Sequence, residues 1–122
     1  MFLNILKSKI HRAAITGASV DYEGSLTISC DLAQRVGLRE YERILVSNMA
    51  NGERFETYVI YGARGAGVIE LNGATAHLGN IGDRVTIMNF GWYSAVEADK
   101  HRPAVVILDE NNKIIRESGV AT

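Results

Sequence analysis

The chain has 122 residues, of which 47% are hydrophobic and 22% charged, and a formal net charge of −1. This balance is typical of one soluble globular domain, residues 1–122, and it excludes the basic surface of a nucleic-acid or anionic-membrane binder. There is no run of the ~20 apolar residues that cross a bilayer, the N-terminus does not read as a signal peptide, and the single cysteine, Cys30, cannot form an intrachain disulfide, so we expect a cytoplasmic protein.

Short strands separated by glycine-containing turns dominate the predicted secondary structure. Runs rich in β-branched and apolar residues predict strands at 2–20 (one or two), 26–30, 43–49, 54–61, 68–71, 84–90, 104–108 and 113–116, and the run 26–30 also alternates between apolar and polar residues. Short helices are expected at 32–36, 74–78 and 94 to about 101. From Glu117 the tail is expected to fray. Many short strands with few helices favour a small, mainly β barrel.

Local sequence signals predict several of the turns and helix ends. Asp31 is the expected N-cap of the first helix, because its side chain can accept a hydrogen bond from the first turn. Asn51-Gly52 predicts a type I′ hairpin, a turn in which both central residues adopt positive φ. Ser94 and Glu97 match a capping box at the start of the last helix.

Two strands carry information about assembly and about the site. Residues 104–108 are apolar on both faces, so we expect them to be covered on both. Because a small barrel fills its own interior, the outer apolar surface points to a closed homo-oligomer. In the strand 54–61, Arg54 and Tyr58 share one face and Thr57 lies on the other.

Several common kinds of site find little support. The three histidines are far apart in sequence, so no metal site is predicted. There is no Gly-x-Ser-x-Gly elbow of a hydrolase. Gly62–Gly67 does not stand between a strand and a helix as a dinucleotide-binding loop does. Lys9 could bind a pyridoxal cofactor, but a barrel of 122 residues leaves little room for one.

The pair Gly24-Ser25 offers a different chemistry. The Ser25 hydroxyl can attack the carbonyl carbon of Gly24 and convert the amide to an ester, and Gly24 has no Cβ to hinder the approach. β-Elimination and loss of ammonia would then leave a pyruvoyl group at a new N-terminus. The chain would be cut into residues 1–24 and 25–122.

Four motifs place this pair in a recognisable context. They are Lys9-Ile10-His11-Arg12, Tyr22-Glu23-Gly24-Ser25, Asn51-Gly52-x-Arg54-Phe55-x-Thr57-Tyr58 and Asn72-Gly73-Ala74-Thr75-Ala76-His77. Together, over roughly residues 1 to 90, they resemble bacterial aspartate 1-decarboxylase. The resemblance implies a six-stranded double-psi β-barrel with short helices and a self-cleaving proenzyme. It also implies a covalent pyruvoyl group, no metal, and a homotetramer that converts L-aspartate to β-alanine for pantothenate, and so coenzyme A, synthesis.

The resemblance also implies roles for individual residues. Ser25 becomes the pyruvoyl group and forms a Schiff base with the substrate amine, after the cut at Gly24. Tyr58 donates a proton to the decarboxylated substrate, and Arg54 holds a substrate carboxylate. Thr57 stabilises the oxyanion of the self-cleavage step and also binds the substrate. The remaining residues expected to serve substrate binding are Lys9, His11, Tyr22, Asn72, Gly73, Ala74 and Thr75, with Lys9 and His11 near enough for processing too.

The sequence departs from the family at a few points and leaves alternatives open. Ser47 stands where some members carry tryptophan, Thr75 replaces a common alanine, and the part from Gly91 on is not matched. Cleavage could need an accessory protein. A self-cleaving hydrolase with a free N-terminal serine and a non-enzymatic β-barrel binding module also remain open.

Overall fold

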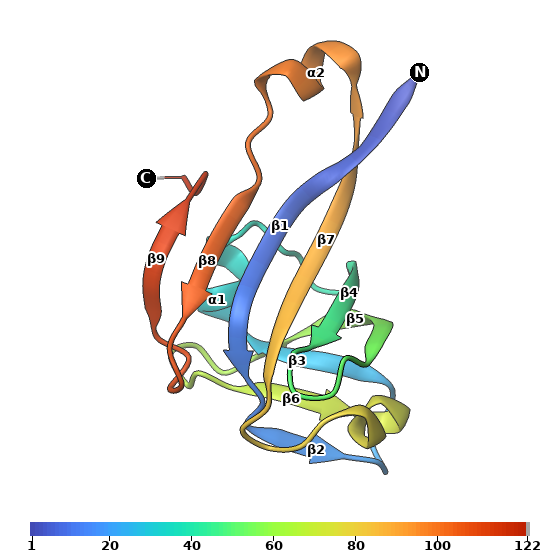
Figure 1. The fold of residues 1–122 in the computed structure, drawn as a ribbon, viewed down its shortest axis with the longest axis vertical. Coiled ribbons are helices and arrows are strands. Elements are labelled where there is room, and N and C mark those ends of the chain that lie inside the picture. Colours follow the sequence, from blue (N-terminus) through green and yellow to red (C-terminus); the bar gives the residue numbers. More distant parts are fainter. Residues whose placement is uncertain (122) are drawn as a thin grey trace.

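Figure 1 shows the protein as a computed structural model, which describes residues 1–121. In chain order the strands are β1 (Phe2–Ala14), β2 (Gly17–Ser19), β3 (Ser25–Ser29), β4 (Arg43–Asn48), β5 (Arg54–Gly62), β6 (Ile69–Asn72), β7 (Arg84–Ser94), β8 (Ala104–Leu108) and β9 (Ile114–Ser118). The helices are α1 (Cys30–Arg35), the 3₁₀ helix η1 (Gly73–Leu78) and α2 (Ala95–Lys100).

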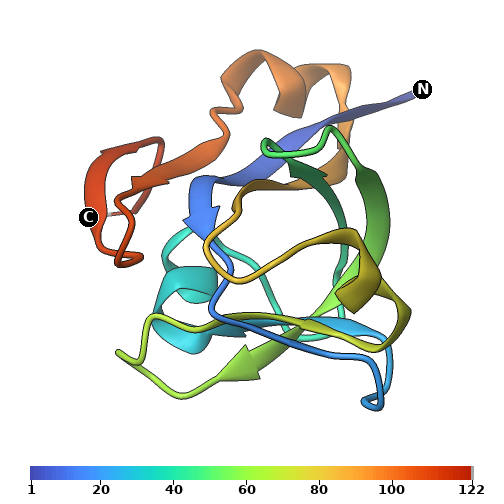
Figure 2. The same ribbon diagram turned by 60° about the horizontal axis from the view of Figure 1, so that its bottom comes forward.

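All of these strands join one sheet in the order β2-β6-β3-β5-β4-β7-β1-β8-β9. The pairs β1/β8, β2/β6 and β3/β5 are parallel, and the others are antiparallel. The strands wrap around a common interior (Figure 2). The predicted mainly β architecture with short helices is confirmed and is consistent with a small β-barrel. The sheet of residues 1–121 has nine strands in all, and these include short edge strands such as β2 and β9.

The core lies on the inward face of the sheet and follows the predicted alternation. Leu26, Ile28 and Val59 are fully buried, whereas the residues between them on β3 and β5 are polar or partly exposed. The same alternation buries Ile69 and Leu71 on β6. The side chains that face outward from β3, β5 and β6 are therefore free to build a site.

Strands β1 and β7 extend beyond the barrel as a two-stranded arm that ends near α2 (Figure 1). β7 reaches Ser94, four residues past the predicted end, because Phe2–Leu6 of β1 pair with the segment 90–94. The predicted capping box is confirmed: Ser94 Oγ accepts from Glu97 N, and the Glu97 carboxylate accepts from Ser94 N.

Two local predictions are wrong. The N-cap of α1 is Ser29 rather than Asp31, because β3 runs directly into the helix; the Asp31 carboxylate instead accepts from Gly65 N at 2.9 Å. Only Gly52 of the pair Asn51-Gly52 has positive φ, so the turn is not type I′. Gly52 N donates to Asn48 O at 2.9 Å, which closes a longer loop.

One C-terminal prediction also needs correction. The tail does not fray at Glu117, because this residue lies in β9 and its carboxylate accepts from Arg35 Nε at 2.5 Å and from Arg35 Nη2 at 2.7 Å. On β8 the single chain buries Val106 and Leu108 and leaves the alternate residues partly exposed, so coverage of the second face by another chain stays a prediction. No helix within residues 1–121 has the length and apolarity to cross a membrane.

Candidate active site

Ser25 lies at the start of β3, directly opposite Asn72 on β6. Its side chain faces outward, opposite to Leu26, yet only 4% of the residue is exposed. Asn72 Nδ2 donates to Ser25 Oγ at 2.9 Å. The contact from Ser25 Oγ to Glu23 O, 3.5 Å, is at the limit of a hydrogen bond. The Ser25 hydroxyl is therefore buried and held chiefly by one amide.

The turn that carries Gly24 packs against Gly73. Gly73 has φ +76°, and a Cβ there would lie 2.7 Å from Gly24 Cα and 2.9 Å from Tyr22 O. Only glycine fits this close approach. At Gly24 itself, a Cβ would meet no atom within 4 Å. The peptide before Ser25 is thus supported from one side by Gly73 and open on the other.

Strand β5 brings Tyr58 next to Ser25. Leu26 pairs with Val59 in parallel register, so the residues just before them, Ser25 and Tyr58, lie side by side on the outward face. The register of β5 against β4 runs without a shift from Arg54 to Tyr58, so the predicted alternation holds. Thr57 therefore projects to the opposite side of the sheet from Tyr58 and Ser25.

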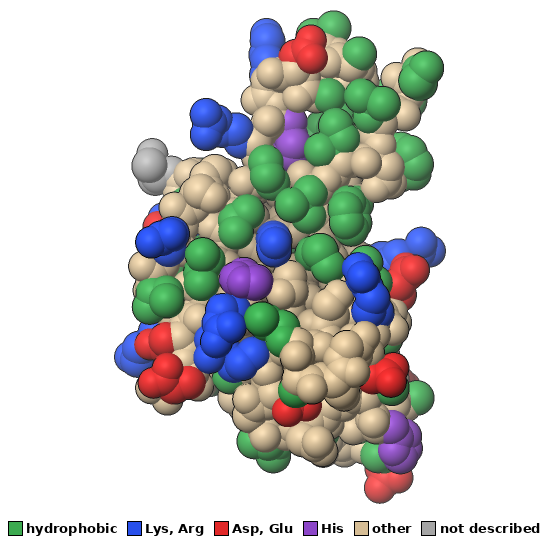
Figure 3. All heavy atoms as spheres, viewed as in Figure 1, with side chains coloured by type: hydrophobic (Ala, Val, Ile, Leu, Met, Phe, Trp, Pro, Cys, Tyr) green, Lys and Arg blue, Asp and Glu red, His purple; other side chains and the backbone are tan. Residues whose placement is uncertain are grey.

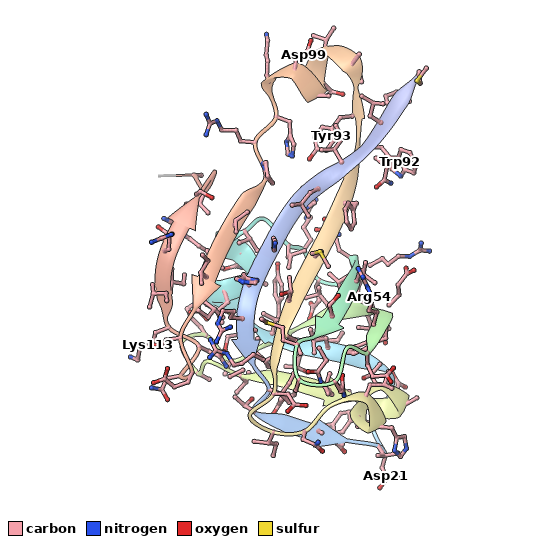
Figure 4. All side chains as sticks on the ribbon, viewed as in Figure 1. Asp21, Arg54, Trp92, Tyr93, Asp99 and Lys113 are labelled. Atoms are coloured by element: carbon pink, nitrogen blue, oxygen red, sulfur yellow. The ribbon has the colours of Figure 1, made fainter. Side chains whose placement is uncertain are left out.

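Arg54 and Tyr22 are exposed in the single chain. Arg54 shares the face of Tyr58 but lies four residues away, about 13 Å along the strand. Figure 4 places it beside β4, away from Asp21 at the tip of the turn that precedes Ser25. Across from Arg54 is Ser47, whose buried Oγ has no hydrogen-bond partner within residues 1–121.

Three further predicted residues follow Asn72 directly. Gly73, Ala74 and Thr75 form the first turn of η1. Thr75 Oγ1 donates to Asn72 O at 3.0 Å, which fixes the backbone of Asn72. Ala74 is exposed. The structure therefore gathers Tyr22, Gly24, Ser25, Tyr58 and the segment 72–75 around one point.

Lys9 and His11 are not brought to this point by a single chain. Both lie on β1, which is separated from β3 in the sheet by β5, β4 and β7. Within residues 1–121 no hydrogen bond links either residue to Ser25 or Asn72. His11 Nδ1 instead lies 3.1 Å from Thr86 Oγ1.

A group of cations surrounds His11. Lys and Arg side chains gather around a histidine on the face shown in Figure 3. Burial lowers the pKa of His11 below its ordinary value of 6.5, and the charges of Lys9, Arg12 and Arg84 lower it further. Burial and the neighbouring charges thus both favour the neutral form of the ring.

We expect the NMR titration of His11 to have its midpoint below pH 6.5. Lys9→Gln removes one neighbouring cation, so the His11 pKa should rise toward its ordinary value. Lys113→Gln is the matched control, since Lys113 is not among the charges that lower this pKa, and it should leave the midpoint unchanged. A midpoint above 6.5, or no response to Lys9→Gln, would contradict this electrostatic account.

A surface pocket of about 480 Å³ opens beside Asn72, the residue that holds the Ser25 hydroxyl. Its lining includes Tyr22, Thr27, Ile60, Tyr61, Glu70 and Asn72. Thr27, Ile60, Tyr61 and Glu70 are not among the predicted site residues. The signal that could have found Thr27 is the polar alternation of Ser25, Thr27 and Ser29 on one face of β3, against Leu26 and Ile28 on the other.

Comparison with known proteins gives a consistent result. The family model described as aspartate decarboxylase matches residues 1–115, which extends the resemblance past residue 90. A protein of Desulfotalea psychrophila named aspartate 1-decarboxylase is 52% identical over 114 residues, covering 93% of this chain and 96% of its own.

Two further relatives carry the same name. The protein of Caldicellulosiruptor saccharolyticus is 49% identical over 118 residues, 97% of this chain and 92% of its own. That of Heliobacterium modesticaldum is 52% identical over 112 residues, 92% of this chain and 85% of its own. The similarity thus spans nearly the whole length of these chains.

Proposed function

The chain belongs to the aspartate decarboxylase family, and on this basis we propose that it converts L-aspartate to β-alanine and CO₂ by loss of the α-carboxylate. The observation that carries the proposal is the 52% identity to an aspartate 1-decarboxylase over 93% of the chain. The β-alanine would serve pantothenate, and so coenzyme A, synthesis in the cytoplasm.

The proposed enzyme matures by cutting its own chain between Gly24 and Ser25, and Ser25 becomes a pyruvoyl group. Support comes from the site: the Ser25 hydroxyl is buried and held by Asn72, and the space at Gly24 is open. These residues fit the group, because the small Ser25 side chain already lies against the Asn72 amide, a donor that can hold a carbonyl. The chemistry that a pyruvoyl group supplies is an electrophilic carbonyl that withdraws electrons as CO₂ leaves.

The other site residues would bind the substrate and move its protons. Tyr58, beside Ser25, would donate a proton to the substrate carbon once CO₂ has left. The guanidinium of Arg54 suits a substrate carboxylate, since its planar fork gives two parallel hydrogen bonds. Tyr22, Gly73, Ala74 and Thr75 would complete the binding pocket.

A second copy of the chain would complete this site, and we propose a closed homotetramer. The unshifted register of β5 leaves Thr57 and Tyr58 on opposite sides of the sheet. Lys9 and His11 lie four strands from β3 in the sheet order. A boundary between two chains would bring these residues together at one substrate. Light scattering should give the mass of four chains, and a fully active monomer would exclude the shared site.

The test of the proposed function is a direct assay. The mature protein, incubated with L-aspartate, should release β-alanine and CO₂ without an added cofactor. Cut protein that gives neither product would overturn the proposal. A fragment 25–122 that begins with free serine would instead indicate the hydrolase, and an uncut, inactive chain the binding module. If the protein is cut only in the presence of a cell extract, maturation needs an accessory protein.

A further inference from the structure

We propose that Thr27 is a positioning residue for self-cleavage at Gly24–Ser25. It holds the amide of Asn72 in the orientation in which one N–H points at Ser25 Oγ. The inference rests on the proposed function, since it assigns a role within the same maturation step. Thr27 lies outside the sequence motifs, and the hydrogen bonds of Asn72 connect it to Ser25 Oγ.

The geometry is a fork between two strands. Asn72 Nδ2 donates to Ser25 Oγ at 2.9 Å and to Thr27 Oγ1 at 2.8 Å. A primary amide has two N–H bonds, so both are used, one on each hydroxyl. Ser25 and Thr27 are two residues apart on β3 and therefore share a face, and Asn72 pairs with Ser25 on β6.

With its backbone held, Asn72 can still move its side chain, and the softest motion is the rotation of its amide. Its backbone is fixed by pairing with Ser25 and Ser19 and by the hydrogen bond from Thr75. The terminal torsion of asparagine is broad and roughly two-fold, and a half turn would present Oδ1 to Ser25 in place of an N–H. The stiff, β-branched Thr27 accepts one N–H and so keeps the other on Ser25.

The oriented N–H acts on the same oxygen in two successive steps. In the first, Ser25 Oγ loses its proton and bonds to the carbonyl carbon of Gly24, the C–N bond breaks, and the nitrogen gains a proton to become an amine. In the second, the Ser25 Cα–H proton is lost and the Cβ–Oγ bond breaks, releasing the Gly24 carboxylate. Addition of water and loss of ammonia complete the pyruvoyl group.

Oγ becomes negative in both steps, first as it loses its proton before attack on Gly24 and then as part of the leaving carboxylate. A hydrogen bond aimed at the atom where charge develops lowers the barrier more than it stabilises the resting state. Asn72 is only 8% exposed and Ser25 4%, so bulk water does not readily replace this donor. Loss of the orienting hydroxyl at Thr27 should therefore slow both steps.

The test compares Thr27→Val, which keeps the shape but removes the hydroxyl, with Thr27→Ser, which keeps the hydroxyl. Cleavage of freshly made full chain is followed by mass spectrometry. We expect Thr27→Val to be cut about tenfold more slowly, the effect of one well-placed hydrogen bond, and Thr27→Ser to stay within about twofold of wild type. Among the cut chains, Thr27→Val should also carry more free N-terminal serine, because a slower elimination gives water time to hydrolyse the ester.

A double-mutant cycle separates positioning from packing. If Thr27 acts through Asn72, Thr27→Val should cause no further slowing in an Asn72→Ala background. Equal slowing in both backgrounds, equal slowing by Val and Ser, or wild-type cleavage of Thr27→Val would each overturn the inference. A wild-type chain that stays uncut even with cell extract would instead overturn self-cleavage itself, and the role of Thr27 with it.

Discussion

Ser25→Ala should leave the chain uncut and without decarboxylase activity. Alanine has no Oγ to attack the Gly24 carbonyl and cannot become a pyruvoyl group, so both the cut and the turnover should be lost completely. The fold should survive, because the change removes one atom from a residue at the start of β3 and creates almost no cavity. Full-length mass, an unchanged circular dichroism spectrum and no β-alanine are the expected results.

Ser29→Ala is the matched control for this variant. Ser29 lies on the same strand and face and is fully buried, and its hydroxyl accepts from Val68 N at 2.9 Å. Its loss should lower stability by about 1 kcal/mol but leave cleavage and turnover intact. A cut Ser25→Ala chain would contradict the role of Ser25, and an uncut Ser29→Ala chain would show that removing any buried hydroxyl of β3 is enough.

Tyr58→Phe should separate maturation from turnover. The phenol is not needed to cut the chain, so this variant should give fragments 1–24 and 25–122. Its decarboxylation rate should fall about 10²- to 10⁴-fold, the range for loss of a positioned proton donor. Binding of L-aspartate should change little, because Phe keeps the ring that packs beside Ser25. The measurement is kcat at saturating L-aspartate, normalised to the fraction of cut chain.

Tyr41→Phe provides the comparison for the loss of a phenol. Tyr41 is 71% exposed, and its link to the barrel is through its backbone N–H, which donates to Val59 O. Its rate should equal that of wild type. If Tyr58→Phe turns over at the wild-type rate, another group donates the proton. If Tyr58→Phe is not cut, the phenol belongs to maturation as well.

Much of the fold could be predicted, because the alternation of apolar and polar residues along a strand indicates which of its faces is buried. The segment from Leu26 to Ile28 and the face division of β5 follow from it directly. The errors arose where neighbouring elements meet. Asp31 matched an N-cap, but nothing in the sequence says that β3 runs into α1 without a loop. Asn51-Gly52 matched a two-residue turn, but a backbone bond from Gly52 to Asn48 closes a longer one.

The candidate site was predicted unevenly for a similar reason. Ser25 and Asn72 stand in motifs, and the structure brings them together across β3 and β6. In the sequence Thr27 resembles any strand residue. Only the register of β3 against β6 brings its hydroxyl within hydrogen-bond distance of the Asn72 amide. The positions of Lys9 and His11 depend on the order of the strands in the sheet, which the sequence does not reveal. In a single chain this order separates β1 from β3.

The mass spectrum of the purified, denatured protein tests the central claim most directly. Self-cleavage with pyruvoyl formation predicts two fragments, 1–24 and 25–122, the larger one lighter by one ammonia than a fragment with N-terminal serine. An intact chain after prolonged warming, in protein that nevertheless decarboxylates L-aspartate, would contradict the account. A larger fragment that keeps its N-terminal serine would contradict it equally.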